Sequence, residues 1–207
     1  SYGTAIVGTV SGTSISFGSA VVFENANTSY TSATYDSTNN KVVIAYRDQG
    51  NSSYGTAIVG TVSGTSISFG TAVVFNAETT SYIVATFDST NAKVVIAYVD
   101  GSNYGTAVVG TVSGTSISFG AEVVFNAAFT YYNAATYDST NNKVVIGYRD
   151  EGNSAYGTAV VFTVASTNLS ATTFLGITSE AISSGATGAI NTYGGINSVQ
   201  TGLTIAS

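Results

Sequence analysis

Short runs of valine, isoleucine, threonine and aromatic residues alternate along the chain with clusters of glycine, asparagine, serine and aspartate. Runs of this kind, bounded by turn-forming residues, are typical of β-strands. In the middle of the chain the pattern predicts four consecutive strands, at 81–87, 93–98, 104–112 and 116–125. Gly120 predicts a bulge or bend within the fourth strand. Both faces of the strand at 104–112 are small and fairly apolar, which favours a sheet covered on both sides.

The same pattern repeats along the chain. The block YGTAIVGTVSGTSISFG occurs at 2–18 and again, letter for letter, at 54–70, and it returns with one change at 104–120. A fading fourth copy begins at Tyr156, so the copies start 52, 50 and 52 residues apart. A fixed period of this size indicates a repeat architecture, in which each copy is one small supersecondary unit.

A second block, YDSTNNKVVIAYRD at 35–48, also returns, at 87–100 and 137–150. All the length variation between copies falls in the loop that follows its last aspartate, so we expect that loop to be exposed and tolerant of insertion. The predicted organisation is a half unit at 2–23, three units at about 28–75, 80–125 and 130–164, and a last segment at 165–207. That segment is rich in Gly, Ser and Thr and is not a copy, which predicts a C-terminal β cap or a junction to another module.

A four-stranded unit of about 50 residues has the size of a β-propeller blade. We therefore predict an all-β fold, and within that class a β-propeller. A β-solenoid or a row of tandem small sandwiches are the alternatives. A chain that starts in mid-unit fits a ring closed by joining its two ends, but a slice of a longer array or a ring shared by several chains fits equally well.

Composition supports a folded chain and excludes some partners. Of the 207 residues 44% are hydrophobic, while five Lys and Arg face eleven Asp and Glu, for a net charge of −6. So few cations predict no nucleic-acid binding, and an acidic chain is repelled by anionic lipid. The longest apolar runs are far shorter than the roughly 18 residues of a spanning helix, so we expect no membrane insertion. Residue 1 is not Met, and we expect a processed chain or part of a longer one.

The chain lacks Cys and His, which removes thiolate and imidazole chemistry, the Ser-His-Asp triad and ordinary transition-metal sites. We therefore expect no enzyme activity, no cofactor and no metal site. Carboxylates are the remaining candidates, and two sets recur at fixed places in the repeat: Asp36, Asp88 and Asp138, and Asp48, Asp100 and Asp150. Symmetric copies do not supply the two unlike carboxylates that a glycosidase needs. We interpret both sets as turn residues whose side chains cap the backbone.

The segments that join successive units vary most, in contrast to the nearly constant first block. They lie at 24–33, 76–85 and 126–135. Each keeps one tyrosine at the same place, and the last copy adds further aromatic area. Because flat aromatic faces stack on sugars and tyrosine suits adaptable recognition, we predict a binding surface made of Tyr30, Tyr82, Phe129, Tyr131 and Tyr132. The alternative interpretation is that these rings only pack the units together.

The tandem copies of YGTAIVGTVSGTSISFG and ATYDSTNNKVVIAYRD resemble repeats of tail-fibre-like and other virion-associated proteins of marine and cyanobacterial phages. The end segment FLGIT…AISSGATGAI…GGI…TGL resembles a segment that closes such fibres. The resemblance covers 2–164 and 174–204 and implies no catalytic residue. It implies a location on the virion surface or another extracellular place.

Our leading hypothesis is a non-enzymatic structural and receptor-binding (adhesive) protein of a phage tail fibre or similar appendage. Its partner would be a host-surface glycan or protein, bound through many weak copies. We expect a homo-oligomer or an assembly with other virion proteins. One alternative is a bacterial extracellular or cell-surface protein that assembles into filaments or a layer, and another is a polysaccharide depolymerase.

Overall fold

The strand pattern of the sequence is realised throughout the part of the chain that can be described. The structure, a computed structural model, describes residues 1–165. The predicted cap or junction therefore lies outside the described residues, except for Ala165. The elements are β1 (Tyr2–Ala5), β2 (Gly8–Ser11), β3 (Ser14–Phe17), β4 (Val21–Asp36), β5 (Lys41–Asp48), β6 (Tyr54–Ser63), β7 (Ser66–Phe69), β8 (Val73–Thr79), β9 (Ser81–Asp88), β10 (Lys93–Val99), β11 (Tyr104–Ser113), β12 (Ser116–Phe119), β13 (Val123–Asp138), β14 (Lys143–Asp150), the short 3-10 helix η1 (Glu151–Asn153) and β15 (Tyr156–Phe162).

Each full unit is an antiparallel meander. In unit 2, β9 pairs with β10, β10 with β11, and β11 with both β12 and the first part of β13. Unit 1 repeats this order with β4, β5, β6 and the pair β7 and β8. The fourth strand is interrupted at Gly120, where the prediction placed a bulge or bend. The Gly120 N–H still donates to the Val109 carbonyl at 3.0 Å, so the interruption stays attached to the sheet.

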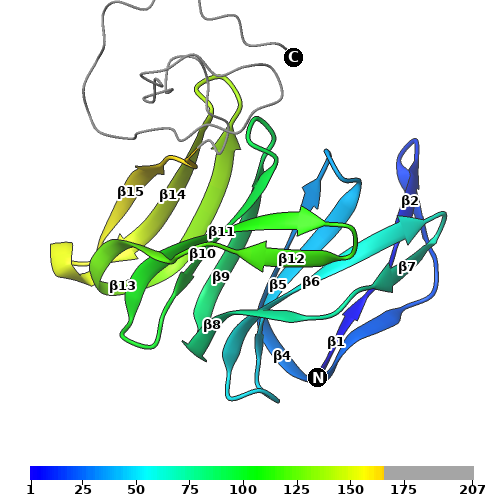
Figure 1. Ribbon diagram of the computed structural model, residues 1–207, viewed down its shortest axis with the longest axis horizontal. Helices are drawn as coiled ribbons and strands as arrows, with labels where there is room; N and C mark the ends of the chain where they lie inside the picture. The colour runs from blue at the N-terminus through cyan, green and yellow to red at the C-terminus, as the bar shows by residue number, and fades with distance from the viewer. Residues whose placement is uncertain (166–207) are drawn as a thin grey trace, which may run out of the picture. The chain divides into compact units, whose positions relative to one another are not determined.

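The two ends of the array are incomplete units. The half unit consists of β1, the start of β4 and the separate two-stranded β2–β3 sheet. Unit 3 consists of the second part of β13 with β14 and β15. Figure 1 shows the half unit at one end of the described chain and β14 and β15 at the other.

Successive units are joined by strands that run from one sheet into the next. The first part of β4 pairs with β1 and its second part with β5. In the same way β13 pairs first with β11 and then with β14. Between units 1 and 2 the connecting strand is interrupted at Thr80, so that β8 pairs with β6 and β9 pairs with β10. Because no loop intervenes, the bend at each crossing sets how one unit is placed on the next.

The units pack face to face, so the inner sheets are covered on both sides, as the apolar faces of the strand at 104–112 predicted. One core cluster joins small side chains of unit 1, such as Val43 and Ala57, to larger ones of unit 2, such as Ile96 and Ile117. A second cluster joins unit 2 to unit 3, and a third joins the half unit to unit 1. Burial between units, rather than within one, therefore supplies the core.

One phenylalanine–tyrosine pair packs across each junction between successive units. The ring of Phe23 lies 5.2 Å from that of Tyr46 in the next unit, and Phe75–Tyr98 and Phe125–Tyr148 repeat this at 5.1 and 5.2 Å. Each phenylalanine also covers a glycine of the first block, at Gly3, Gly55 and Gly105, where a Cβ would collide with the ring. In these three copies the glycine after the first tyrosine of the repeat is thus required for packing.

The recurring aspartates are turn residues, which confirms their interpretation. Asp36 Oδ1 accepts the N–H groups of Thr38 and Asn39, and Asp88 and Asp138 do the same in their units. The side chain of Asn141, followed by the backbone N–H groups of Asn141 and Thr140, holds the pKa of Asp138 below its usual range. In the loops of variable length, Asp48, Asp100 and Asp150 accept backbone N–H groups in the same manner. Residues 49–52, 101–103 and 151–154 of these loops are exposed, as predicted.

Candidate functional site

A strained tyrosine stands at each crossing between units. Ser29 pairs with Arg47 and Ser32 with Ala45, so Tyr30 and Thr31 together face the single residue Tyr46. This bulge recurs at Tyr82 and Tyr132. The three tyrosines have φ angles of 50°, 48° and 55°, in the left-handed region that costs a residue with a Cβ about 1–2 kcal/mol. Glycine would remove that cost, so strain repeated three times points to a use for the ring.

Polar contacts hold the crossing in this shape. In unit 2 the N–H of Thr80 donates to the Ser53 carbonyl at 3.1 Å. Its buried hydroxyl donates to the Glu78 carbonyl and accepts from the Asn76 amide, both at 2.9 Å. Thr130 and Asn126 repeat these side-chain bonds in unit 3. A buried threonine whose N–H and hydroxyl are both hydrogen-bonded fixes the backbone next to the bulged tyrosine.

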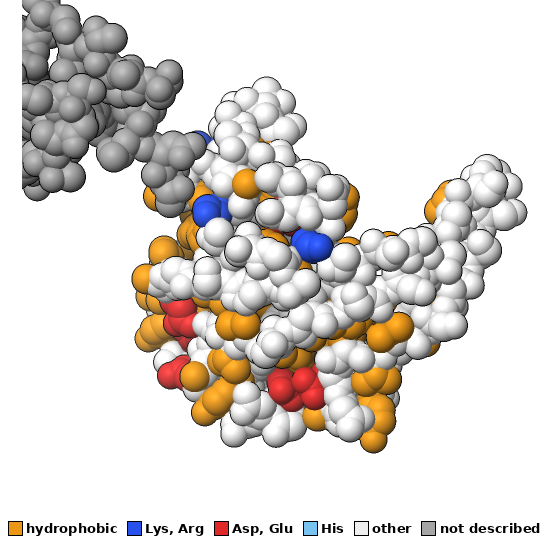
Figure 2. Space-filling view, turned by 45° about the vertical axis from the view of Figure 1, so that its right-hand side comes forward, with side chains coloured by type: hydrophobic (Ala, Val, Ile, Leu, Met, Phe, Trp, Pro, Cys, Tyr) orange, Lys and Arg blue, Asp and Glu red, His pale blue; other side chains and the backbone are white. Residues whose placement is uncertain are grey.

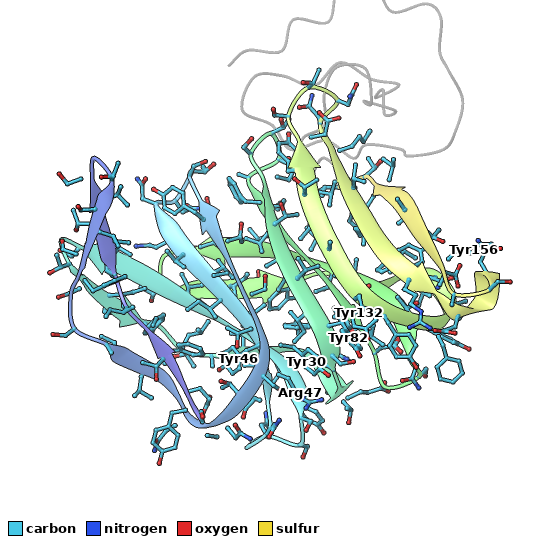
Figure 3. All side chains as sticks on the ribbon, turned by 180° about the vertical axis from the view of Figure 1, so that it is seen from behind. Tyr30, Tyr46, Arg47, Tyr82, Tyr132 and Tyr156 are labelled. Carbon is cyan, nitrogen blue, oxygen red and sulfur yellow. The ribbon has the colours of Figure 1, made fainter. Side chains whose placement is uncertain are left out.

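The bulges place the tyrosine rings in contact across three units. The ring centroid of Tyr82 lies 5.1 Å from that of Tyr30 and 5.1 Å from that of Tyr132. Tyr131 stands perpendicular to Tyr82 at 5.7 Å. We call Tyr30, Tyr82, Tyr131 and Tyr132 the tyrosine row; Figure 3 shows three of its members following one another. Tyr30 and Tyr132 are exposed, so the row is a surface and not part of the core.

The structure therefore brings four of the five predicted binding residues together. The fifth, Phe129, is exposed and lines a shallow pocket of about 350 Å³ with Tyr131 and Glu151. The pocket thus continues the aromatic surface at one end of the row. The expectation that these rings only pack the units together describes their contacts with one another, but not their exposure.

Two arginines flank the row, and sequence reasoning missed this role. The Arg47 guanidinium lies 4.8 Å from the centre of the Tyr30 ring, and its Nε donates to Ser29 at 3.0 Å. Arg149 lies 5.8 Å from the Tyr131 ring and forms an ion pair with Glu151 at 2.6 Å. The signal in the sequence was positional, since both arginines precede the closing aspartate of the second block while Val99 occupies that place in unit 2. The row is thus uncharged in the middle and has an arginine at each end, and the arginine at the Tyr131 end is paired with Glu151.

The hydroxyl group of Tyr82, in the middle of the row, stays protonated in neutral solution. Partial burial of Tyr82, followed by its neighbours Tyr30, Tyr132 and Tyr131, raises the pKa of Tyr82 above its usual range. Tyr82 therefore offers a neutral phenol, which can both donate and accept a hydrogen bond.

The residue opposite each bulge is a buried tyrosine, and the copies differ there. The Tyr46 hydroxyl donates to the Glu24 carboxylate at 3.1 Å. The hydroxyl of Tyr98 is buried and has no hydrogen-bond partner among the described residues. Burial, and then nearby carboxylates, raises the pKa of both side chains.

The described residues hold no group of three or more His, Cys, Asp or Glu side chains placed to bind a metal ion. Within residues 1–165 no helix is long and apolar enough to cross a membrane. On the face drawn in Figure 2, the Lys and Arg side chains form small separate spots, while hydrophobic side chains are exposed in several places. That face is therefore better suited to apolar and hydrogen-bonding ligands than to a polyanion.

Comparison of the chain with models of protein families, with curated proteins and with solved structures finds no significant match.

Proposed function

We propose that the tyrosine row is a carbohydrate-binding surface. The observation that carries the proposal is three tyrosines held in left-handed backbone conformation, two of them exposed and one half-buried, with rings in contact across three units. Strain of this kind concentrates where a side chain serves a ligand. Ring faces stack on the apolar faces of sugars, and phenol groups bond to sugar hydroxyls.

The length and polarity of the row favour an extended saccharide over a compact ligand. Its rings succeed one another from unit to unit, so they fit a chain of similar residues better than one small molecule. Arg47 has its Nε bonded to Ser29 and its guanidinium plane over Tyr30, which presents the remaining donors to a hydroxyl or carboxylate oxygen. Each contact is weak, and several chains or copies acting together would provide avidity.

This surface supports our leading hypothesis of a non-enzymatic, structural and receptor-binding (adhesive) protein. The partner would be a host-surface glycan or a glycosylated protein, and the place of action a virion surface or another extracellular setting. The resemblance of the repeats to phage tail-fibre-like proteins supports the same function. The turn-capping roles of the recurring aspartates argue against the polysaccharide depolymerase.

For the fold, we propose that the units are sectors of a β-propeller. Two features support this. The sheets stack face to face, and the first strands of successive units lie side by side, since β9 contacts both β4 and β13. In such an arrangement the tyrosine row would lie along the central channel of the propeller, beside the first strands of its units. Electron imaging of the full chain tests this, because a solenoid would show a straight or coiled rod.

The binding proposal is tested with asparagine substitutions. Asparagine tolerates the left-handed conformation, so Tyr82→Asn and Tyr132→Asn remove the ring and keep the bulge. Tyr156→Asn is the matched control, because Tyr156 is 65% exposed against 64% for Tyr132 and lies away from the row in Figure 3. An immobilised oligosaccharide panel identifies the probe, and calorimetry with the best oligosaccharide gives its affinity.

We expect each row substitution to weaken binding by about 2- to 13-fold, the worth of one aromatic contact, with no change for the control. Wild-type protein that binds no member of the panel, or row variants that bind like the control, would leave the rings a structural role only. Release of sugar from the probe would favour the depolymerase instead.

A further inference from the structure

The half unit exposes a group of large apolar side chains. We call Ile6, Val10, Ile15 and Phe17 the leading face; all four are exposed. The first 23 residues contain no charged side chain, so the half unit itself places no charge among these four side chains. Contiguous apolar surface without charge is unusual on a protein that acts alone, and it marks interaction sites.

The leading face has buried counterparts inside the chain. Ile15 is 54% exposed, whereas Ile67, the same residue of the identical block, is 8% exposed. In unit 2 the counterparts Val108 and Ile117 belong to the core cluster shared with unit 1. Ile67, Val108 and Ile117 are therefore buried where a unit precedes theirs, whereas Val62, the counterpart of Val10 in unit 1, stays 44% exposed.

The other end of the array exposes the surface on which such side chains dock. We call Val145, Ala159 and Val161 of unit 3 the trailing face. Their counterparts in unit 1, Val43, Ala57 and Val59, are fully buried in the cluster shared with unit 2. Val161, by contrast, is 60% exposed.

The side of unit 3 that faces unit 2 is filled by a residue of unit 3 itself. Phe162 occupies the place of Gly110, where a Cβ would meet the side chains of Ile117 and Phe119. No described strand supplies those two side chains to unit 3, and the Phe162 ring packs against the cluster shared with unit 2 instead. Phe162 therefore fills the side of unit 3 that faces unit 2, while Val161 on the other side is exposed.

We propose that the leading face of one chain docks on the trailing face of a second copy. The occupant is argued from continuity with an interface that the chain already makes between its own units, in which β12 lies against β6 and β8. In the assembly β3 takes the place of β12, and β15 that of β6. Because the two faces differ, the contact is heterologous, and repeated docking produces a ring or an open filament.

The experiment is sedimentation velocity of the full chain over a concentration series, with one charge placed on each face. Ile15→Asp alters the leading face and Val161→Asp the trailing face. Both side chains are exposed in the single chain, so folding is retained, which circular dichroism checks. Val124→Asp is the matched control, since Val124 is exposed like its counterparts Val22 and Val74 and belongs to neither face.

We expect the wild type and Val124→Asp to associate as concentration rises. Each face variant alone stays monomeric, because an unpaired charge buried in the contact lowers the association constant by more than about 100-fold. An equimolar mixture of the two variants forms dimers and nothing larger, since each supplies the face that the other has lost.

Three results would overturn the proposal. One is a wild type that stays monomeric at every concentration, whether the trailing face is bare or is covered by residues 166–207. Another is association that neither face variant weakens. The third is dimers formed by a face variant alone, which would show a symmetric contact. Neither substitution touches the tyrosine row, so loss of assembly and loss of glycan binding are separate outcomes.

Discussion

Residues 2–18 and 54–70 have the same sequence and different structures. In the second copy β6 is one strand of ten residues, whereas in the first copy the chain is interrupted at Ile6 and Val7, between β1 and β2. Ile58 is 4% exposed, and its counterpart Ile6 is 49% exposed. Identical local preferences therefore do not determine the length of the strand.

The difference lies in the neighbours. β6 is hydrogen-bonded to β5 on one side and to β7 and β8 on the other, and units pack on both of its faces. Within the described sheets, β1 pairs only with β4, and β2 only with β3. Strand formation in this repeat therefore depends on burial and on pairing with neighbouring strands. This agrees with the general finding that the β-propensity of a residue reflects its packing environment more than an intrinsic backbone preference.

The largest expected effect compares the two copies directly. Ile58→Ala lowers the free energy of unfolding by about 2–5 kcal/mol, because it opens a cavity in the core. Ile6→Ala lowers it by less than about 1 kcal/mol, because the side chain is already half exposed. Urea unfolding, followed by circular dichroism at a concentration where the chain is monomeric, measures both. Equal losses would show that the half unit is as tightly packed as unit 1.

A second comparison uses the glycine that follows the first tyrosine of the block. Gly105→Ala places a Cβ in the Phe125 ring and costs about 1–3 kcal/mol of stability, the range for overpacking. At Gly157 no atom lies within 4 Å of a Cβ, and alanine there raises stability by up to about 1 kcal/mol, since glycine is costly in a strand. Thermal unfolding of the two variants decides. A loss in Gly157→Ala would mean that a further ring covers this position.

The buried tyrosines Tyr46 and Tyr98 allow units 1 and 2 to be compared at a single atom, the hydroxyl oxygen. Tyr46→Phe removes the bond to Glu24 and costs about 1–2 kcal/mol, whereas Tyr98→Phe removes an unpaired hydroxyl and is neutral or stabilising. Burial raises the pKa of both tyrosines above 10.0, so neither hydroxyl ionises in the folded protein below that pH, and the stability of the fold decreases progressively as the pH rises above it. The advantage of Tyr98→Phe over the wild type therefore grows in alkaline unfolding measurements above pH 10. A constant difference from neutral to alkaline pH would contradict the burial of this hydroxyl.

The smallest effect concerns the turn after the first strand of each unit. Ala92 has a φ of 51°, where units 1 and 3 carry Asn40 and Asn142. Ala92→Asn should raise stability by about 0.5 kcal/mol, because asparagine tolerates the left-handed conformation better than alanine does. Ala92→Val serves as the control and destabilises, since a β-branched residue is least compatible with a positive φ. Both shifts are read from thermal unfolding midpoints.

The strands and turns of unit 2 were largely predictable, because the repeated sequence blocks mark where each strand begins and ends. The predicted strands at 81–87, 93–98 and 104–112 end within one residue of β9, β10 and β11. The turn aspartates were recognisable because their side-chain chemistry is local. The interruption of the fourth strand at Gly120 and that of the first block at Ile6 were not predicted in this form, since both depend on what pairs with the strand.

The candidate site was predictable by position and not by geometry. A fixed tyrosine in a variable segment singled out Tyr30, Tyr82 and Tyr132. Their left-handed backbone, the 5.1 Å ring contacts and the arginine over Tyr30 come from the bulge and from the offset between stacked units. The sequence of a single unit does not reveal how far successive units are offset from one another.

The amino-acid sequence by itself determined the strands, the turns and the repeat, because these follow from the preferences of neighbouring residues. Tertiary structure alone decided which copies of an identical block are buried, which tyrosines meet and which apolar faces stay open. The physical reason is that burial depends on the unit packed alongside, and residues 2–18 have one neighbouring unit where residues 54–70 have two.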